Sequence, residues 1–391
     1  MLIPRTLSPV LLERARHYPV VTVTGPRQSG KTTLCRQAFP HKPYVTLESL
    51  DEREEALHRP REFLARYPRG AILDEVQRTP QLLSYLQGVV DESKRPGEWI
   101  LTGSQHFSLL HSITQSLAGR TTLLHLLPLS LGELRAQGLP AEPWDLVFAG
   151  GYPRIHEMHL PPGQWLEDYI STYVERDVRE VLQVENLLAF RAFMRLCASR
   201  AGQLINLSGL GAEAGLSHHT ARKWISVLET SFVASRLPPY FASPSKRIVK
   251  SPKLCFYDSG LLCRLLRIES AEMLRSHELR GSIFECWILS ELVKVFLHRG
   301  QQNGWSFFRD HHGREVDAVL DRPARPIAVE IKSSDGLRDA PRSAFAALGA
   351  VLGDAEGALE RLVIHAGNER RSEGGVTWLP WNALDSHAWT S

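Results

Sequence analysis

One segment near the N-terminus constrains the fold more than any other: residues 25–32 read Gly-Pro-Arg-Gln-Ser-Gly-Lys-Thr. They match G-x-x-x-x-G-K-[ST], the phosphate-binding loop (P-loop). The apolar, β-branched run 20–24 before the loop predicts a buried strand, and residues 33–39 after it predict the start of a helix. A functional P-loop needs this strand–loop–helix order, which disfavours the alternative of a chance glycine-rich turn. The sequence therefore predicts an α/β domain that binds a nucleoside triphosphate.

The predicted loop gives its residues distinct roles. Gly25 and Gly30 permit backbone conformations that a Cβ atom would obstruct. The loop N–H groups then surround the β-phosphate of ATP, Lys31 reaches the β- and γ-phosphate oxygens, and Thr32 binds Mg²⁺. The predicted cofactor-binding residues are Gly25, Pro26, Arg27, Gln28, Ser29, Gly30, Lys31, Thr32 and Thr33.

A second, acidic element indicates hydrolysis rather than binding alone. The apolar run 71–73 ends in Asp74 and Glu75, which is the pattern of a Walker B strand. Asp74 is predicted to hold Mg²⁺, directly or through water. Glu75 is predicted to be the base that orients or activates the attacking water. The alternative, a core strand with an acidic exit turn, is disfavoured by the preceding P-loop.

Further polar residues are candidates for contact with the γ-phosphate. Ser104 and Gln105 follow the apolar run 99–102, where a polar side chain can sense the γ-phosphate, although a plain turn explains them equally well. Ser104 completes the predicted cofactor-binding set. Arg120 precedes the strand-like run 121–127, and an arginine placed there can reach the nucleotide of a neighbouring subunit as a catalytic finger. The alternative for Arg120 is a surface or structural role.

Composition narrows the class of protein. The 391 residues suffice for two or three domains, and 43% hydrophobic with 23% charged residues is typical of a soluble globular protein. No apolar run approaches the roughly 18 residues of a membrane span, and the first residues lack the features of a signal peptide. The five cysteines form no C-x-x-C pair, so neither zinc nor disulfides are predicted. A reduced cytoplasm is the expected location.

The middle of the chain is predicted to be mainly helical. The charged run 165–184 is either a solvated helix face or part of a lid that contacts a neighbouring subunit. Beyond it, a short helix over 207–214, a tight turn at 215–217, a helix over 218–229 and a strand over 232–235 follow one another. This helix–turn–helix–strand order predicts a winged helix.

The second helix and the run after it supply candidate DNA contacts. Residues 236–253 hold five basic side chains and no acidic one. Such groups suit the phosphate backbone, and the exposed helix face can reach phosphates or base edges. Winged helices also bind proteins, so a protein partner is the alternative. The DNA-contact candidates are His219, Thr220, Arg222, Lys223, Lys246, Arg247 and Lys250.

The C-terminal part carries a second set of carboxylates. Asp317 lies in one strand-like run, and Glu330 and Lys332 share one face of the next. Phosphodiester hydrolysis needs carboxylates that hold Mg²⁺ and a lysine that positions or activates water. Asp317 and Glu330 are therefore predicted metal ligands, Lys332 is a catalytic candidate, and Glu285 in an upstream helix is a fourth member. Charged pairs on edge strands are common, so both retained and lost cleavage stay open.

With these residues in place, the chain resembles bacterial and archaeal ATPases that join an AAA-type P-loop domain to a C-terminal DUF4143 domain. The resemblance covers roughly residues 1–340 and implies an additional-strand P-loop fold, ATP and Mg²⁺ as cofactors, and a C-terminal domain similar to restriction-endonuclease-like folds. It rests on residues 25–33, 72–77, 101–105, 116–120, 314–317 and 330–334.

We therefore expect an α/β protein with a P-loop ATPase domain (1–150), a helical lid with a winged helix (151–245) and a PD-(D/E)xK-like domain (246–391). The first functional hypothesis is a DNA-associated, Mg²⁺-dependent ATPase in which ATP drives or gates DNA binding, remodelling or translocation, as a hexamer or another ring. Its nuclease-like domain either binds or cuts DNA. The alternative is a nucleotide-dependent protein-interaction switch with an inactive nuclease-like domain. A third possibility is a metal-dependent nuclease gated by ATP. No membrane partner is expected.

Overall fold

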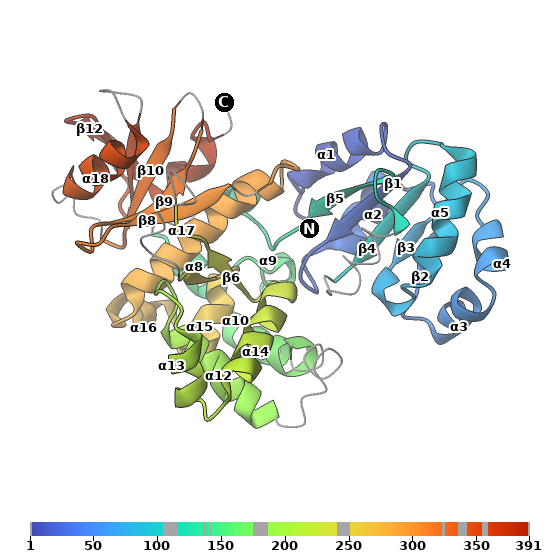
Figure 1. Cartoon of the computed structure of the whole chain (residues 1–391), viewed down its shortest axis with the longest axis horizontal. Coiled ribbons are helices and arrows are strands. Elements are labelled where there is room, and N and C mark those ends of the chain that lie inside the picture. Colours follow the sequence, from blue (N-terminus) through green and yellow to red (C-terminus); the bar gives the residue numbers. More distant parts are fainter. Residues whose placement is uncertain are drawn as a thin grey trace.

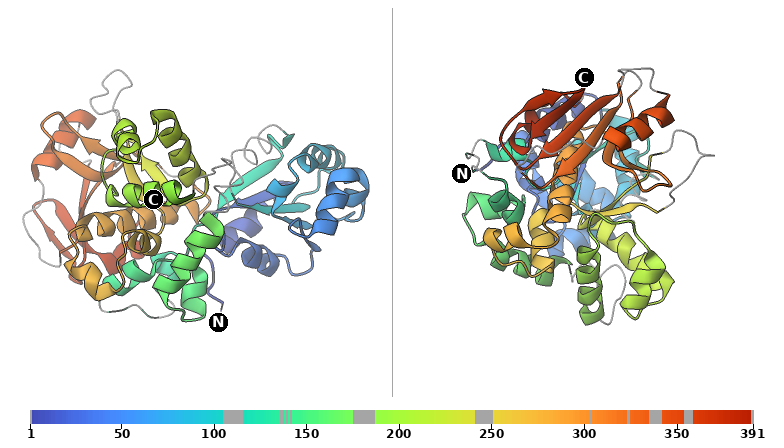
Figure 2. Two further views of the ribbon diagram at one scale, coloured as in Figure 1. Left: turned by 90° about the horizontal axis from the view of Figure 1, so that it is seen from below. Right: turned by 90° about the vertical axis from the view of Figure 1, so that its left-hand side faces the viewer.

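The chain folds into an N-terminal part and a larger second part that lie side by side in the views of Figures 1 and 2. The structure is a computed structural model. It describes residues 2–104, 116–135, 138, 140, 142–174, 187–240, 251–302, 304–322, 325–334, 342–353 and 359–389.

The N-terminal part contains a five-stranded sheet whose pairings are all parallel. Across the sheet the strands are β2 (Tyr44–Thr46), β3 (Ile72–Asp74), β4 (Trp99–Gly103), β1 (Val20–Thr24) and β5 (Thr121–His125). The predicted P-loop strand is β1, and the predicted Walker B strand is β3. Because β4 lies between them, the sheet contains the additional strand that the family resemblance implies.

Helices cover both faces of this sheet, which is why β1 and β4 are buried along their whole length. One face packs against two helices, and the other packs against helices that follow β2 and β3. In chain order they are α1 (Leu7–Arg14), α2 (Lys31–Ala38), α3 (Leu50–His58), α4 (Pro60–Ala65) and α5 (Leu82–Ser93).

The middle of the chain is helical, as predicted. Its elements are α7 (Leu131–Leu134), α8 (Trp144–Ala149), α9 (Pro153–Glu157), α10 (Pro162–Tyr169), a π-helical turn (Ile170–Val174), α12 (Leu187–Ser199), α13 (Leu207–Glu213) and α14 (His218–Thr230). Side-chain caps start the last two helices: Asn206 accepts the N–H of Gly209, and Ser217 accepts that of Thr220. After α14 the chain forms β6 (Ala234–Leu237), which pairs antiparallel with β7 (Lys253–Phe256). The strand thus starts two residues later than predicted.

The C-terminal part contains a six-stranded mixed sheet. Its order is β12 (Arg371–Glu373), β13 (Val376–Pro380), β11 (Glu360–His365), β10 (Ile327–Lys332), β9 (Glu315–Leu320) and β8 (Trp305–Arg309). Its helices are α15 (Ser259–Leu265), α16 (Ala271–Ser276), α17 (Arg280–Leu297) and α18 (Arg342–Leu352). The core on one face of the sheet includes α17, and that on the other includes α18.

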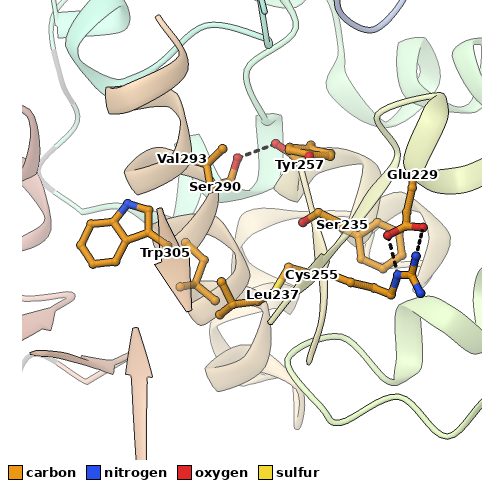
Figure 3. Close-up of a pocket in the computed structure, with 11 residues that line it drawn as sticks. Glu229, Ser235, Leu237, Cys255, Tyr257, Ser290, Val293 and Trp305 are labelled. Carbon is orange, nitrogen blue, oxygen red and sulfur yellow. Dashed lines mark hydrogen bonds and ion pairs between the residues drawn. The ribbon is translucent and has the colours of Figure 1, made fainter. Parts of the chain in front are cut away.

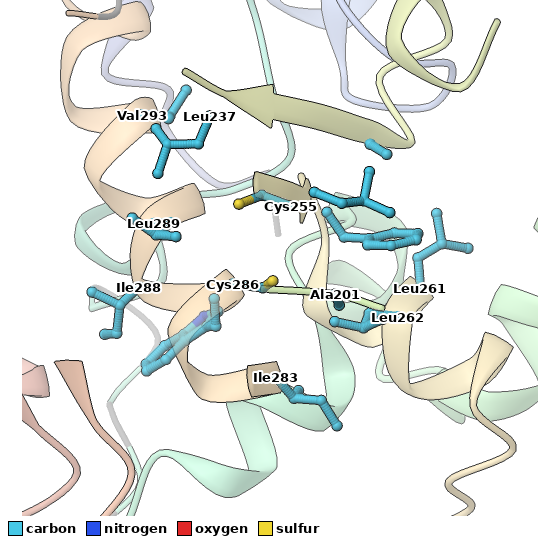
Figure 4. Close-up of a cluster of buried hydrophobic side chains, with 14 of the residues drawn as sticks. Ala201, Leu237, Cys255, Leu261, Leu262, Ile283, Cys286, Ile288, Leu289 and Val293 are labelled. Atoms are coloured by element: carbon cyan, nitrogen blue, oxygen red, sulfur yellow. The ribbon is translucent and has the colours of Figure 1, made fainter. Parts of the chain in front are cut away.

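Helix α17 is the centre of the second part. Of its 18 residues, 13 are buried, far more than the single stripe that a surface helix hides. Figure 4 shows its side chains Ile283, Ile288 and Leu289 among apolar groups of other elements, including Leu262 of α15 and Cys255 of β7. Burial of each large apolar side chain contributes roughly 1.5–3 kcal/mol. These contacts tie α17 to most of the second part. Among the described residues, no helix is both long and apolar enough to span a bilayer.

Candidate nucleotide site and C-terminal carboxylate cluster

The P-loop joins the end of β1 to the start of α2, and two of its positions require glycine. Gly25 has a φ of +152°, and a Cβ atom there would lie 2.1 Å from the carbonyl oxygen of Leu126. Gly30 has a φ of +94° and caps α2 in the left-handed region. The N-terminal end of α2 therefore opens directly onto the loop, which is the arrangement that binds phosphate.

The lysine of the loop is held close to the loop backbone. Its Nζ donates hydrogen bonds to the carbonyl oxygens of Gly25 (3.0 Å) and Pro26 (2.7 Å). The side chain of Lys31 is buried, so its positive charge lies at the loop and is little screened by water. The hydroxyl of Ser29 is also buried and, within the described part of the chain, has no hydrogen-bond partner. These groups fit a polyanionic ligand such as the phosphates of ATP.

Thr32 and Asp74 meet as the prediction of a Mg²⁺ site requires. The Thr32 hydroxyl donates to both carboxylate oxygens of Asp74, at 3.1 and 3.0 Å. Asp74 also accepts hydrogen bonds from the hydroxyls of Tyr44, at 2.7 Å, and Thr102. Burial and the hydrogen bond to Asp74 raise the pKa of Tyr44. A hydroxyl and a carboxylate are hard oxygen ligands that suit Mg²⁺ bound together with nucleotide phosphates.

Tyr44 and Thr102 are site residues that the sequence analysis missed. Thr102 follows the Leu73–Leu101 register pair of β3 and β4, so it stands beside Asp74. The sequence feature that could have indicated Thr102 is its position as the polar residue after the apolar run 99–101. Tyr44 reaches Asp74 from β2, and no local pattern indicates this contact.

Glu75 lies in a strained turn and is linked to Ser104. Its φ of +59° is in the left-handed region, which is uncommon for a residue other than glycine. Gln77 donates one hydrogen bond to the Glu75 carboxylate and another, of 2.9 Å, to the Ser104 hydroxyl. Burial raises the pKa of Glu75, while the charges of Lys31 and Arg27 oppose that rise. Gln77 is a third residue that the sequence analysis missed, although it lies only two positions after Glu75.

The predicted finger has a partner within its own chain. Arg120 forms two hydrogen bonds to the carboxylate of Asp91 in α5, of 2.5 and 2.8 Å. An exposed ion pair of this kind contributes little to stability and can exchange with another partner. Contact with a neighbouring subunit therefore stays a prediction. Gln105, the other residue named with Ser104, lies outside the described residues.

The candidate DNA contacts are described in part. His219, Arg222 and Lys223 are exposed on α14, and Thr220 is half-buried beside the Ser217 cap. The opposite face of the helix is buried in the core. Lys246, Arg247 and Lys250 lie outside the described residues.

The C-terminal side chains predicted to form a metal site converge, but with an additional cation among them. Lys253 of β7 places its Nζ 2.8 Å from Glu285 of α17 and 3.5 Å from Asp317 of β9. On β10, the Nζ of Lys332 lies 2.6 Å from Glu330. Among the described residues, no group of three or more His, Cys, Asp or Glu is arranged to hold a metal ion. The metal-binding role of Glu285, Asp317 and Glu330 therefore stays a prediction, and the ammonium of Lys253 lies near two of these carboxylates.

The electrostatics of this cluster reflect its burial. Burial alone would lower the pKa of Lys253, but the carboxylates around it hold that pKa above its ordinary value. Burial and the nearby charge of Asp317 raise the pKa of Glu330 to about 7. The sequence analysis assigned Lys253 only to the basic run 236–253, because nothing in its neighbourhood along the chain indicates the three carboxylates that it meets.

A separate cavity of about 170 Å³ lies between β6, β7, α17 and β8 (Figure 3). Its lining includes Trp305, Val293 and the ion pair between Glu229 and Arg236. Typical sites for small molecules are roughly 300–1,000 Å³, so this cavity is too small for a nucleotide. It contains none of the predicted site residues.

Comparison with known proteins identifies matches along most of the chain. Residues 17–135 match an AAA domain, residues 141–272 match the domain of unknown function DUF8612, and residues 280–384 match the domain of unknown function DUF4143. The uncharacterized proteins Mb2031c of Mycobacterium bovis and Rv2008c of Mycobacterium tuberculosis are each 30% identical over 351 residues, which cover 88% of this chain and 78% of theirs.

The solved structures that match part of the chain include two whose TM-scores lie below 0.5. The Walker-type ATPase PABY2304 of Pyrococcus abyssi is 15% identical, with a TM-score of 0.45, over 66% of this chain and 94% of that one. AMPPCP-bound DnaA from Aquifex aeolicus is 14% identical, with a TM-score of 0.30, over 57% of this chain and 86% of that one.

Proposed function

Because the chain belongs to the family that joins an AAA-type P-loop ATPase domain to a C-terminal DUF4143 domain, we propose that it hydrolyses ATP to gate contact with DNA. In this proposal, the N-terminal domain binds and hydrolyses ATP. The candidate DNA contacts lie in the second part of the chain, on α14.

The residues of the nucleotide site have complementary roles in hydrolysis. Lys31 binds the β- and γ-phosphate oxygens, while Thr32 and Asp74 would hold Mg²⁺, which neutralises charge that develops on the phosphates. Glu75 orients the attacking water and accepts its proton. Gln77 acts through another residue: its two hydrogen bonds fix the Glu75 carboxylate relative to Ser104.

The observation that carries the gating proposal is a chain of buried contacts behind the P-loop. Arg5 donates to the carbonyl oxygens of Ser29 (2.5 Å) and Leu127 (2.7 Å) and forms a 3.1 Å ion pair with Glu133. The Glu133 carboxylate lies 3.6 Å from His298, the residue that ends α17. A change in the loop on ATP binding would therefore reach α17 through three side chains.

The segment after β5 is tied to α17 at further points. The N–H of Leu127 donates to His298, the Nζ of Lys294 donates to the carbonyl of Leu129, and the N–H of Leu131 donates to Glu291. At its other half, α17 packs against β7, which pairs with the strand that follows α14. The nucleotide site and the candidate DNA helix are thus joined through one helix.

Two fold assignments support the proposal without being needed for it. The order α13–α14–β6–β7 supports a winged helix, and the order α17–β8–β9–β10–α18–β11 supports a restriction-endonuclease-like domain. Both are folds that bind DNA in other proteins.

ATPase and DNA-binding assays on the full chain test the proposal. We expect single-stranded, duplex or branched DNA to raise the ATPase rate several-fold, and Lys31→Ala to abolish turnover. Arg222→Ala combined with Lys223→Ala should weaken DNA binding and leave the basal ATPase rate unchanged. Arg61→Ala, which removes an exposed positive charge from α4, is the matched control. An ATPase rate insensitive to every DNA form, with no binding at low salt, would contradict the proposal and favour a protein partner.

A further inference from the structure

We propose that the ammonium of Lys253 takes the place of a divalent metal in the C-terminal carboxylate cluster, so that this nuclease-like domain does not cleave DNA. The inference concerns the C-terminal domain alone and does not depend on the function proposed for ATP. It rests on the contacts of one buried lysine.

Lys253 is surrounded by carboxylates from two elements. Its Nζ lies 2.8 Å from Glu285 of α17, and 2.5 Å from Glu315 and 3.5 Å from Asp317 of β9. An ammonium has three N–H donors, and here three carboxylates surround it. The Nζ also lies 5.5 Å from the centre of the Phe307 ring, a distance at which a ring face attracts a cation.

The cation is held in this position by the fold. Lys253 is only 2% exposed and is the first residue of β7. Its backbone pairs with Leu237 of β6 on one side and forms a bridge with Leu204 on the other. The backbone that carries the ammonium is thus paired on both sides, and burial of the side chain keeps the ammonium among the carboxylates.

A metal ion would need the same space and the same oxygens. Mg²⁺ binds oxygen at about 2.0–2.1 Å with near-octahedral geometry. An ion at that distance from Glu285 and Asp317 would lie against the Lys253 Nζ, where like charges repel. The structure thus provides a cation for these carboxylates from its own chain.

Most oxygens of Asp317 and Glu330 also have partners of their own. The second oxygen of Asp317 accepts the N–H of Ile331 at 2.8 Å, and one oxygen of Glu330 is bound by Lys332 at 2.6 Å. The other Glu330 oxygen is buried and has no hydrogen-bond partner within the described ranges. Of the four oxygens of Asp317 and Glu330, this is the one without a partner in the described part of the chain, so a Mg²⁺ ion bound by both residues would have to compete with an existing partner.

The cluster then has a structural role. It joins β7, which follows the α13–α14 unit, to α17 and to the C-terminal sheet. The domain would bind or position a partner without hydrolysing a phosphodiester bond.

Manganese binding to the full chain tests the inference. The protein is titrated with Mn²⁺ in the absence of nucleotide, and free Mn²⁺ is measured by electron paramagnetic resonance. Wild-type protein should show no stoichiometric site, and it should not cut DNA with Mg²⁺ or Mn²⁺. Lys253→Met should gain one Mn²⁺ per chain, and adding Asp317→Asn should remove it.

Three outcomes would overturn the inference. They are a wild-type Mn²⁺ site that Asp317→Asn removes, cleavage that Asp317→Asn abolishes, and a folded Lys253→Met protein that binds no Mn²⁺. If Lys253→Met does not fold, the melting temperature of the wild-type protein with Mn²⁺ or with EDTA tests the inference instead. It should be unchanged by Mn²⁺ and by EDTA, whereas a rise with Mn²⁺ that is lost in Glu285→Gln would count against the proposal.

Discussion

The guanidinium of Arg5 donates a hydrogen bond to the carbonyl oxygen of Ser29, so a residue at the start of the chain supports the P-loop from behind. The same side chain is buried and lies 3.1 Å from the carboxylate of Glu133. Arg5 therefore neutralises a buried charge and positions the loop, two roles that one substitution should disturb together.

Arg5→Ala should lower the free energy of unfolding by about 3–5 kcal/mol, because it leaves the buried Glu133 carboxylate without its guanidinium. Urea denaturation monitored by tryptophan fluorescence measures this loss. Arg16→Ala, which removes an exposed arginine just after α1, should change the stability by less than about 0.5 kcal/mol. Equal effects of the two substitutions would refute the structural role of Arg5.

Gln77→Ala should lower kcat for ATP by about tenfold or more with little change in KM, because the hydrogen bonds of Gln77 go to Glu75 and Ser104 and position the Glu75 carboxylate. Its hydrogen bond lowers the pKa of Glu75, so its loss should also move the acid limb of the kcat profile to higher pH. Steady-state assays between pH 5 and pH 8 measure both effects.

Gln81→Ala, at an exposed position before α5, is the control for Gln77→Ala and should leave the profile unchanged. A reduced kcat without any shift of the acid limb would show that Gln77 does not act through Glu75.

Arg120→Ala should lower kcat at least tenfold if the guanidinium completes the site of a neighbouring subunit. Asp91→Ala breaks the same exposed ion pair but leaves Arg120 free to reach a neighbour, so it should not reduce kcat. Both variants should keep nearly wild-type stability, since exposed pairs contribute about 0–1 kcal/mol. A similar kcat in the two variants would restrict Arg120 to its contact with Asp91.

Acid should destabilise the protein in two steps. Burial lowers the pKa of His298 to about 3, so the folded state favours the neutral ring and stability declines as pH falls below about 6.5. The charge of Arg5 and backbone hydrogen bonds, joined by the charge of His298 once its ring is protonated at low pH, overcome burial and lower the pKa of Glu133 to about 2. Its contribution, about 3 kcal/mol, is present above about pH 4.3 and is lost as pH falls towards 2.

Equilibrium unfolding at a series of pH values measures this decline. His298→Gln should flatten the slope between pH 6.5 and pH 4, whereas His58→Gln, at an exposed position of α3, should not. An unchanged slope in His298→Gln would mean that other groups titrate in this range.

The nucleotide site could be predicted because its groups lie in short segments with fixed geometry. A P-loop between a strand and a helix determines where Lys31 and Thr32 lie, and parallel strands bring Asp74 to the same edge. Four of the five strands of the parallel sheet correspond to the runs 20–24, 71–75, 99–102 and 121–127, whereas the short edge strand β2 was not predicted, and the additional strand was implied by the family resemblance.

The parts that could not be predicted depend on contacts between residues distant in the chain. Arg5 meets Glu133 across 128 positions, and Lys253 meets Asp317 across 64. Arg5, Glu133 and Lys253 each look like an ordinary surface charge in the local sequence, and only Asp317 was singled out. Glu285 and Asp317 both lie near the ammonium of Lys253, which belongs to the basic segment that was predicted to contact DNA.

The burial of α17 has a mechanical consequence. From Glu285 to His298 the distance along the helix axis is about 20 Å at 1.5 Å per residue. The hydrogen-bonded backbone makes this helix stiff along its axis. The segment after β5 contacts the C-terminal end of α17, and the Lys253 ion cluster contacts its N-terminal half. If ATP binding displaces the segment after β5, a stiff α17 would respond by tilting or shifting as a whole and would carry the displacement to the Lys253 cluster.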